Sequence, residues 1–171
     1  MSDEPASEVA TARATEVARL IDQFERAIDG DAWHGDPVMT ILGRVTFETA
    51  GAKPAKAAHS IRQIVRHMAA WTNEVRRRMN GEPAGTPLEG DWPRAADKDE
   101  DAWRAEIAAL AAAHQSLLAD LRALPEARLF EPINDPRNRA TGAGVSRYVL
   151  LHGLAQHHAY HAGQIAILSK F

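Results

Sequence analysis

The chain has 171 residues, of which 45% are hydrophobic and 25% are charged, and this composition suits one globular domain spanning residues 1–171. A formal net charge of −3 argues against a nucleic-acid-binding protein. No apolar run is long enough to span a membrane and the first residues are acidic, so we expect a cytoplasmic protein. Cysteine is absent, which excludes disulfides, thiolate metal ligands and a cysteine nucleophile. Any thiol in a reaction must therefore arrive as a substrate.

Helical periodicity first appears in a long segment from about Glu8 to Ile28. A short helical segment follows at about Val38–Ala50, where Asp36 is placed to cap it and Pro37 to occupy its first position. The connection from the first long helix to the second therefore has about 30 residues, which is long enough to cross the length of a bundle. Strict up-down-up-down order is not required.

Three further long helices complete the pattern. They are predicted at about His59–Met79, Asp99–Leu124 and Ala143–Ser169, and two Pro- and Gly-rich stretches, Gly81–Lys98 and Phe130–Gly144, are predicted as loops. Strand signals are weak, because β-branched runs are short and no alternating segment of useful length occurs. The sequence therefore predicts an all-α, four-helix bundle without an internal repeat or a domain boundary.

Two histidines in the last helix suggest a metal site. His157 and His161 are four residues apart, so they lie on the same helical face, and imidazole is a good ligand for zinc, nickel, copper or iron. The alternative is a pair of core histidines that bond to side chains or water. His158 projects about 100° away from His157 and is expected at the rim or surface. The predicted seam of this helix consists of Leu150, Leu154, His157, His161, Ile165 and Leu168.

A third ligand has to come from another helix, and periodicity leaves two choices. His67 lies at the edge of the apolar stripe of the second long helix, where a lone histidine is most often a partly buried surface residue. His114 lies within the seam of the third long helix. The hydrophobic pattern alone does not choose between them.

Several motifs together resemble the DinB-like family of metal-dependent enzymes, over nearly the whole chain. The motifs are Ala32-Trp33-His34-Gly35, Ser60-Ile61 with His67 and Trp71, Asp91-Trp92-Pro93, and His157-His158-Ala159-Tyr160-His161-Ala162-Gly163-Gln164-Ile165. The resemblance implies a four-helix bundle with a three-histidine site for zinc or nickel. Matched residue by residue, it assigns His67, His157 and His161 as the ligands, and so favours His67 over His114.

The resemblance also implies a class of activity. Relatives of this type are thiol-dependent S-transferases or isomerases that use low-molecular-weight thiols, and they commonly form homodimers. We therefore expect a metal-dependent S-transferase or hydrolase that acts on a small-molecule substrate. The alternatives are a non-catalytic bundle that binds a small ligand or a metal, and a structural protein whose histidines no longer bind one.

Other polar side chains are candidates for the chemistry. Gln164 lies three residues after His161 and is expected to contact a substrate or to serve helix packing. Glu74 is expected to be a general base or a carboxylate that supports the metal ligands from behind, or else a solvated helical residue. Arg137 and Arg139 are either a clamp for a carboxylate of a thiol cofactor or plain surface charge. Four rings are expected to line the mouth of the site or to belong to the core: Trp33, His34, Trp71 and Tyr160.

Overall fold

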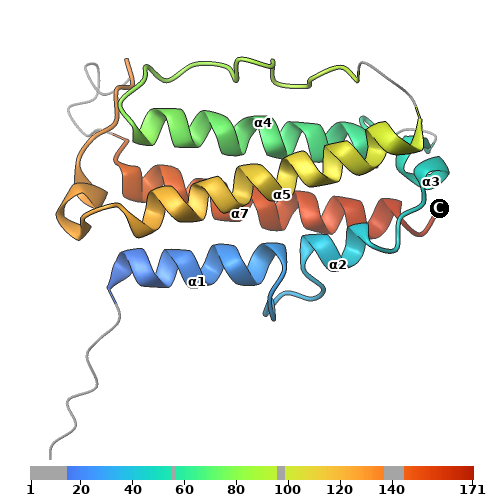
Figure 1. The fold of residues 1–171 in the computed structure, drawn as a ribbon, viewed down its shortest axis with the longest axis horizontal. Helices are drawn as coiled ribbons and strands as arrows, with labels where there is room; N and C mark the ends of the chain where they lie inside the picture. The colour runs from blue at the N-terminus through green and yellow to red at the C-terminus, as the bar shows by residue number, and fades with distance from the viewer. Residues whose placement is uncertain (1–14, 55–56, 96–98, 137–144) are drawn as a thin grey trace, which may run out of the picture.

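The computed structural model describes residues 15–54, 57–95, 99–136 and 145–171, and its architecture is an all-α four-helix bundle (Figure 1). The long helices are α1 (Glu16–Ile28), α4 (Ile61–Met79), α5 (Glu100–Arg122) and α7 (Arg147–Leu168). Three short elements accompany them: α2 (Val38–Leu42), α3 (Phe47–Gly51) and the 3-10 helix η1 (Glu126–Phe130). Within the described residues, β pairing is limited to an isolated bridge between Pro132 and Ser146. None of the described helices combines the length and apolar character needed to traverse a bilayer.

The helix order is not a simple up-down-up-down sequence. In Figure 1, α1 and α7 run in one direction, whereas α4 and α5 run in the other. Helix α1 packs against α5 and α7, and α4 also packs against α5 and α7. The connection from α1 to α4 is long, as predicted, and it contains α2 and α3. The segment that runs along the length of the bundle is instead the one after α4, residues 80–95 (Figure 1).

The predicted helix at Val38–Ala50 is divided into α2 and α3. A new helix begins within it because Thr46 acts as an N-cap, and its side chain accepts a hydrogen bond from the backbone N–H of Thr49. The prediction for Pro37 was also wrong by one position. Its backbone is extended (φ −69°, ψ 161°), so Pro37 is itself the N-cap of α2, without a capping side chain.

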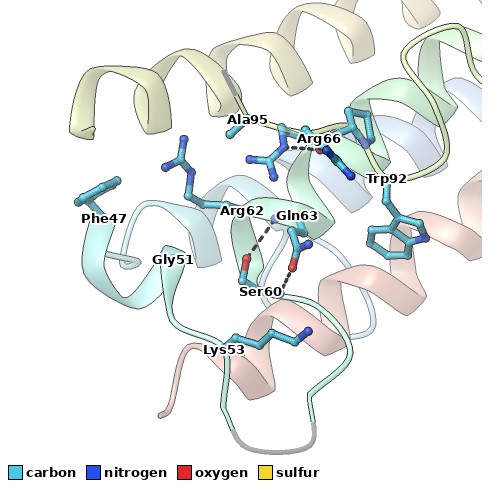
Figure 2. A pocket seen from close by; sticks show the side chains of 11 residues that line it. Phe47, Gly51, Lys53, Ser60, Arg62, Gln63, Arg66, Trp92 and Ala95 are labelled. Carbon is cyan, nitrogen blue, oxygen red and sulfur yellow. Dashed lines mark hydrogen bonds between the residues drawn. The ribbon is translucent and has the colours of Figure 1, made fainter. Parts of the chain in front are cut away.

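Helix α4 begins and ends with well-defined caps. Ser60 and Gln63 form a capping box, in which the Ser60 N–H donates to Gln63 Oε1 at 2.9 Å and the Gln63 N–H donates to Ser60 Oγ at 3.4 Å (Figure 2). At the other end, Gly81 has φ of +97°, a conformation that favours glycine and ends the helix. These caps define the start and the end of the helix that carries His67.

The core consists of two apolar clusters with a polar layer between them. One cluster surrounds Phe24 and Leu121, and the other surrounds Ile64 and Ile165. Along α4, α5 and α7, the residues that separate the two clusters are Thr72, His114 and His158, and all three are buried. A hydrogen bond between Thr72 and His158 satisfies part of this layer, whereas Nδ1 of His114 and Nδ1 of His158 have no partner among the described residues, which is destabilising for buried groups.

The start of α7 is anchored to the end of α4 by Arg147. This buried guanidinium donates from Nε to the carbonyl oxygen of Met79 at 2.9 Å, and from Nη1 to the carboxylate of Glu131 at 3.0 Å. The contact satisfies a carbonyl near the C-terminal end of α4. It also helps to set the position of α7 along α4, the two helices that carry the histidine cluster.

Candidate metal centre

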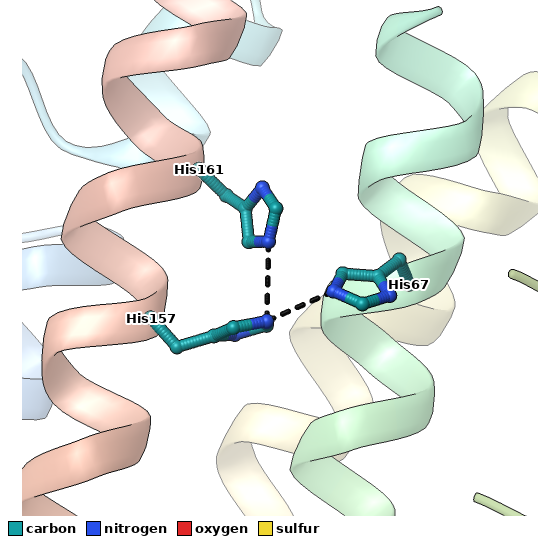
Figure 3. A group of neighbouring side chains, drawn as sticks. All are labelled: His67, His157 and His161. Atoms are coloured by element: carbon teal, nitrogen blue, oxygen red, sulfur yellow. Dashed lines mark hydrogen bonds between the residues drawn. The ribbon is translucent and has the colours of Figure 1, made fainter. Parts of the chain in front are cut away.

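Three histidines from two helices point their Nε2 atoms at one another (Figure 3). His67 comes from α4, and His157 and His161 come from successive turns of α7. The Nε2 atom of His157 lies 2.9 Å from that of His67 and 3.1 Å from that of His161. The ligand atoms of the triad all lie within 4.8 Å of one another. The structure thus brings the three predicted ligands together.

Two of these rings are held by oxygen acceptors behind them. The Nδ1 of His67 lies 2.6 Å from the backbone carbonyl oxygen of Asp91, and the Nδ1 of His161 lies 2.7 Å from Oε1 of Gln164. An acceptor at Nδ1 places the ring hydrogen there and leaves the lone pair at Nε2. Both rings therefore present Nε2 as a ligand atom toward the centre of the triad.

The hydrogen count in the triad leaves lone pairs that need a partner. Only His157 can place a hydrogen at Nε2, and that hydrogen can serve one of the two facing rings. Burial, and then the neighbouring His161 and His67, lower the pKa of His157 to about 3, so this ring is neutral near pH 7. Three imidazoles whose Nε2 lone pairs face one another are the donor set that a divalent cation accepts. Tetrahedral ligands about 2.05 Å from zinc lie about 3.3 Å apart, close to the 2.9 and 3.1 Å that separate Nε2 of His157 from Nε2 of His67 and of His161.

Burial also lowers the pKa of His161, and the hydrogen bond to Gln164 offsets part of this shift. His67 and His161 are buried, with 6% and 4% of their surface exposed, whereas His157 is half-buried at the edge of the helix interface. The triad therefore lies at the margin of the core, with His157 on its more open side.

A sequence comparison bears directly on this arrangement. The family model of the DinB superfamily matches residues 31–165, a span that includes all three histidines. The chain belongs to the DinB superfamily. No curated protein and no solved structure matches it. The family resemblance and the all-α bundle expected from the sequence are thus both confirmed.

Two loop residues surround His67 in this DinB-superfamily protein. The Trp92 ring stacks on the His67 ring, with centroids 4.0 Å apart, and on the His59 ring at 3.4 Å on a nearly parallel plane. The Asp91 carboxylate accepts a hydrogen bond from Nε1 of Trp71 at 2.7 Å, while its backbone carbonyl bonds His67. The sequence had marked Asp91 and Trp92 as part of the family resemblance, but hydrophobic periodicity gave no signal for a loop that folds back onto α4.

The prediction for His158 was wrong. The ring is fully buried (0% exposed), and it packs against Phe24 and His114 in the polar layer. Thr72 Oγ1 donates to the carbonyl of Met68 at 2.8 Å, so its 3.1 Å contact with His158 is an N–H donated by Nε2. Because α1, α4 and η1 all pack on α7, more than one face of this helix is covered.

The remaining histidine candidates lie outside the triad. His114 is buried in the polar layer, and the histidine that joins His157 and His161 in the cluster is His67. His34 is exposed and lines a separate cavity beside Gly163. Arg137 and Arg139 lie outside the described residues.

Glu74 is not the solvated helical residue that was one of its two expected roles. Its side chain is 1% exposed and pairs with two arginines of the same helix, including Arg78 Nε at 2.7 Å and a short contact to Arg77. The backbone N–H of Gly85 also donates to it. Although burial raises its pKa, the hydrogen bonds from Arg78 and Arg77 dominate and lower it overall. An ionised carboxylate held in this way connects α4 to the following loop.

The aromatic candidates have different environments. Trp71 is half-buried and faces the triad, with its centroid 6.4 Å from that of His157. Tyr160 is exposed beside His161. Trp33 is fully exposed, so the expectation that it belongs to the core was wrong. Trp71 and Trp92 are the large rings that cover the triad.

Proposed function

We propose that this protein binds a divalent cation, zinc or nickel, through Nε2 of His67, His157 and His161. We further propose that it is a metal-dependent enzyme acting on small molecules, as an S-transferase or a hydrolase. The observation that supports the proposal is the convergence of the three Nε2 atoms, two of them fixed by acceptors at Nδ1. Three imidazole ligands leave a coordination position for a reactant, which is typical of catalytic sites and not of closed structural ones.

The residues around the triad have separate tasks in this proposal. Gln164 and the Asp91 carbonyl hold two ligand rings and keep their Nε2 lone pairs free of hydrogen. Trp71 and Trp92 limit the access of water on the α4 side. When bound, a divalent cation supplies Lewis acidity that makes water or a thiol a nucleophile near neutral pH. Since the chain has no cysteine, the thiol is a second substrate and transfer is direct.

The proposal is tested by the metal content of protein made without a histidine tag. We expect about one zinc or nickel ion per chain, and loss of the ion in His161→Ala. The matched control is His152→Ala, which changes the half-buried histidine of α7 that lies outside the triad. Protein that stays empty after incubation with either metal, or a His161→Ala variant that keeps its ion, would refute the ligand assignment.

Activity is measured separately on the loaded protein. Cysteine and 2-mercaptoethanol are offered as thiols with an electrophilic alkene or an epoxide, and activated esters are offered for hydrolysis. Turnover that disappears in His161→Ala supports an enzyme. Stoichiometric metal without turnover on any of these substrates favours the non-catalytic binding bundle instead.

A further inference from the structure

A cationic pocket lies beside the candidate metal centre, at the start of α4. Its volume is about 550 Å³, and its walls come from α3, the segment after it, the first turns of α4 and the loop around Trp92 (Figure 2). Among the described residues that line it, none is acidic and four are basic: Lys53, Arg62, Arg66 and Arg94. This local surplus of positive charge contrasts with the net charge of −3 of the whole chain.

Two of the basic side chains are held rigidly in the pocket wall. Glu106 of α5 accepts from Arg62 through Nε at 2.8 Å and Nη2 at 2.7 Å, and from Arg66 through Nη1 at 2.8 Å. Arg66 Nε also donates to the carbonyl of Pro93 at 2.9 Å. All three charged side chains are largely buried. Both guanidiniums are thus fixed in place before any ligand arrives.

Two acidic residues, Glu106 and Asp99, offset part of the positive charge of this wall. Glu106 is shared by the two guanidiniums, and Asp99 at the start of α5 also acts on Arg62. Lys53 and Arg94 add two exposed cations at the rim. A net positive, preorganised wall favours an anionic group, since charge-assisted hydrogen bonds to arginine and lysine are stronger than neutral ones.

The pocket also offers apolar contact surfaces. Phe47 lies at one side, where the Arg62 guanidinium sits 5.5 Å from the ring centroid. Trp92 lines the other side with its edge, because its two faces stack on His59 and on His67 of the triad. The pocket and the candidate metal centre therefore share one side chain as a common wall.

We propose that this pocket binds the carboxylate or phosphate group of a small molecule and holds the rest of that molecule between Phe47 and the edge of Trp92. The binding itself depends only on the pocket. The role of this molecule as the substrate rests on the function proposed above, and it makes the substrate class an organic anion.

The test measures calorimetric binding of benzoate, phenyl phosphate and the uncharged benzamide to the full chain at low salt, with and without zinc. We expect at least one of the two anions to bind at least about tenfold more tightly than benzamide. The variant Lys53→Glu/Arg94→Glu reverses two exposed charges and leaves the buried arginines intact. It is expected to weaken binding of that anion at least about tenfold.

The matched control is Arg44→Glu/Lys170→Glu, which reverses two exposed charges in a different cavity of about 500 Å³. It changes the net charge by the same amount and is expected to leave anion affinity nearly unchanged. Tighter binding of benzoate or of phenyl phosphate then identifies the carboxylate or the phosphate as the preferred group.

Three results would overturn the inference: equal binding of benzamide and both anions, equal weakening in both double variants, or anion binding that requires zinc and ignores Lys53→Glu/Arg94→Glu. The last result would place the anion on the metal. The two proposals fail separately. Absence of zinc binding with pocket-dependent anion binding sinks only the metal proposal, whereas stoichiometric zinc with no anion binding sinks only the pocket.

Discussion

The variant Gln164→Leu tests whether the acceptor behind His161 controls metal affinity. In the structure, Oε1 of Gln164 lies 2.7 Å from Nδ1 of His161, whose ring is 4% exposed. Leucine has a similar volume but no acceptor, so the Nδ1 hydrogen loses its partner and the ring becomes less basic and freer to rotate. Loss of such a supporting hydrogen bond lowers metal affinity by roughly 10- to 100-fold. This corresponds to about 1.4–2.8 kcal/mol.

Zinc affinity is measured by competition with a chromogenic chelator at pH 7.5, with urea unfolding of the metal-free protein as a check on stability. Gln156→Leu is the matched control, because Gln156 lies on the exposed face of the same helix. Gln164→Glu keeps an acceptor and adds charge, so we expect it to bind zinc at least as tightly as the natural protein. It also tests the orientation of the Gln164 amide, since a carboxylate can only accept.

The reasoning is refuted if Gln164→Leu binds zinc as tightly as Gln156→Leu does. It is equally refuted if Gln164→Glu loses zinc, because the glutamine would then be needed as a donor. In that case the hydrogen of His161 would lie on Nε2, and this ring would not be a ligand.

Two further predictions concern buried charge and pH. Glu74→Gln removes the carboxylate shared by Arg77 and Arg78, so we expect urea unfolding to show a loss of roughly 3 kcal/mol, with unchanged zinc stoichiometry; zinc loss in a folded variant would contradict this. Burial, and then Arg122, lower the pKa of His114 to about 4. In the unfolded chain the histidine pKa is near 6.5, so between pH 7 and pH 5 the unfolded chain binds more protons at this residue than the folded protein does. The free energy of unfolding therefore falls on acidification, by about 2 kcal/mol from pH 7 to pH 5 for His114. In metal-free protein, His114→Leu should remove this part of the loss of stability between pH 7 and pH 5, as measured by urea unfolding. If the dependence of stability on pH is the same in the variant, the lowered pKa of His114 is contradicted.

Much of the fold could be predicted because its helices carry strong local signals. Both ends of α4 were predicted within about two residues. Ser60 and Gln63 form a capping box at its start, and Asn80-Gly81 ends it. The division of the second predicted segment into α2 and α3 was missed. It depends on one capping contact of Thr46, which hydrophobic periodicity does not register.

The candidate site was predictable only in part. The spacing of His157 and His161 is a local property of α7, whereas the choice of His67 required the family resemblance, because periodicity favoured neither His67 nor His114. The error on His158 has a physical cause. Apolar residues occur on several sides of α7, so the sequence does not define a single buried face, and the helix wheel was centred about one residue away from the true stripe. The role of Asp91 depends on a tertiary contact that no helical pattern encodes.

The bond between His158 and Thr72 has a consequence for the neighbouring residue. His157 and His158 are adjacent, and one faces the triad while the other faces the centre of the bundle. A slip of α7 by one residue would turn it by about 100°, and would put His158 in the place of His157 and Ala159 in the place of His158. The same slip would break the hydrogen bond between His158 and Thr72 and the ring contact between His158 and Phe24. The buried hydrogen bond between His158 and Thr72 thus fixes the rotation of α7 about its axis, and in this way it orients His157 toward the triad without contacting it.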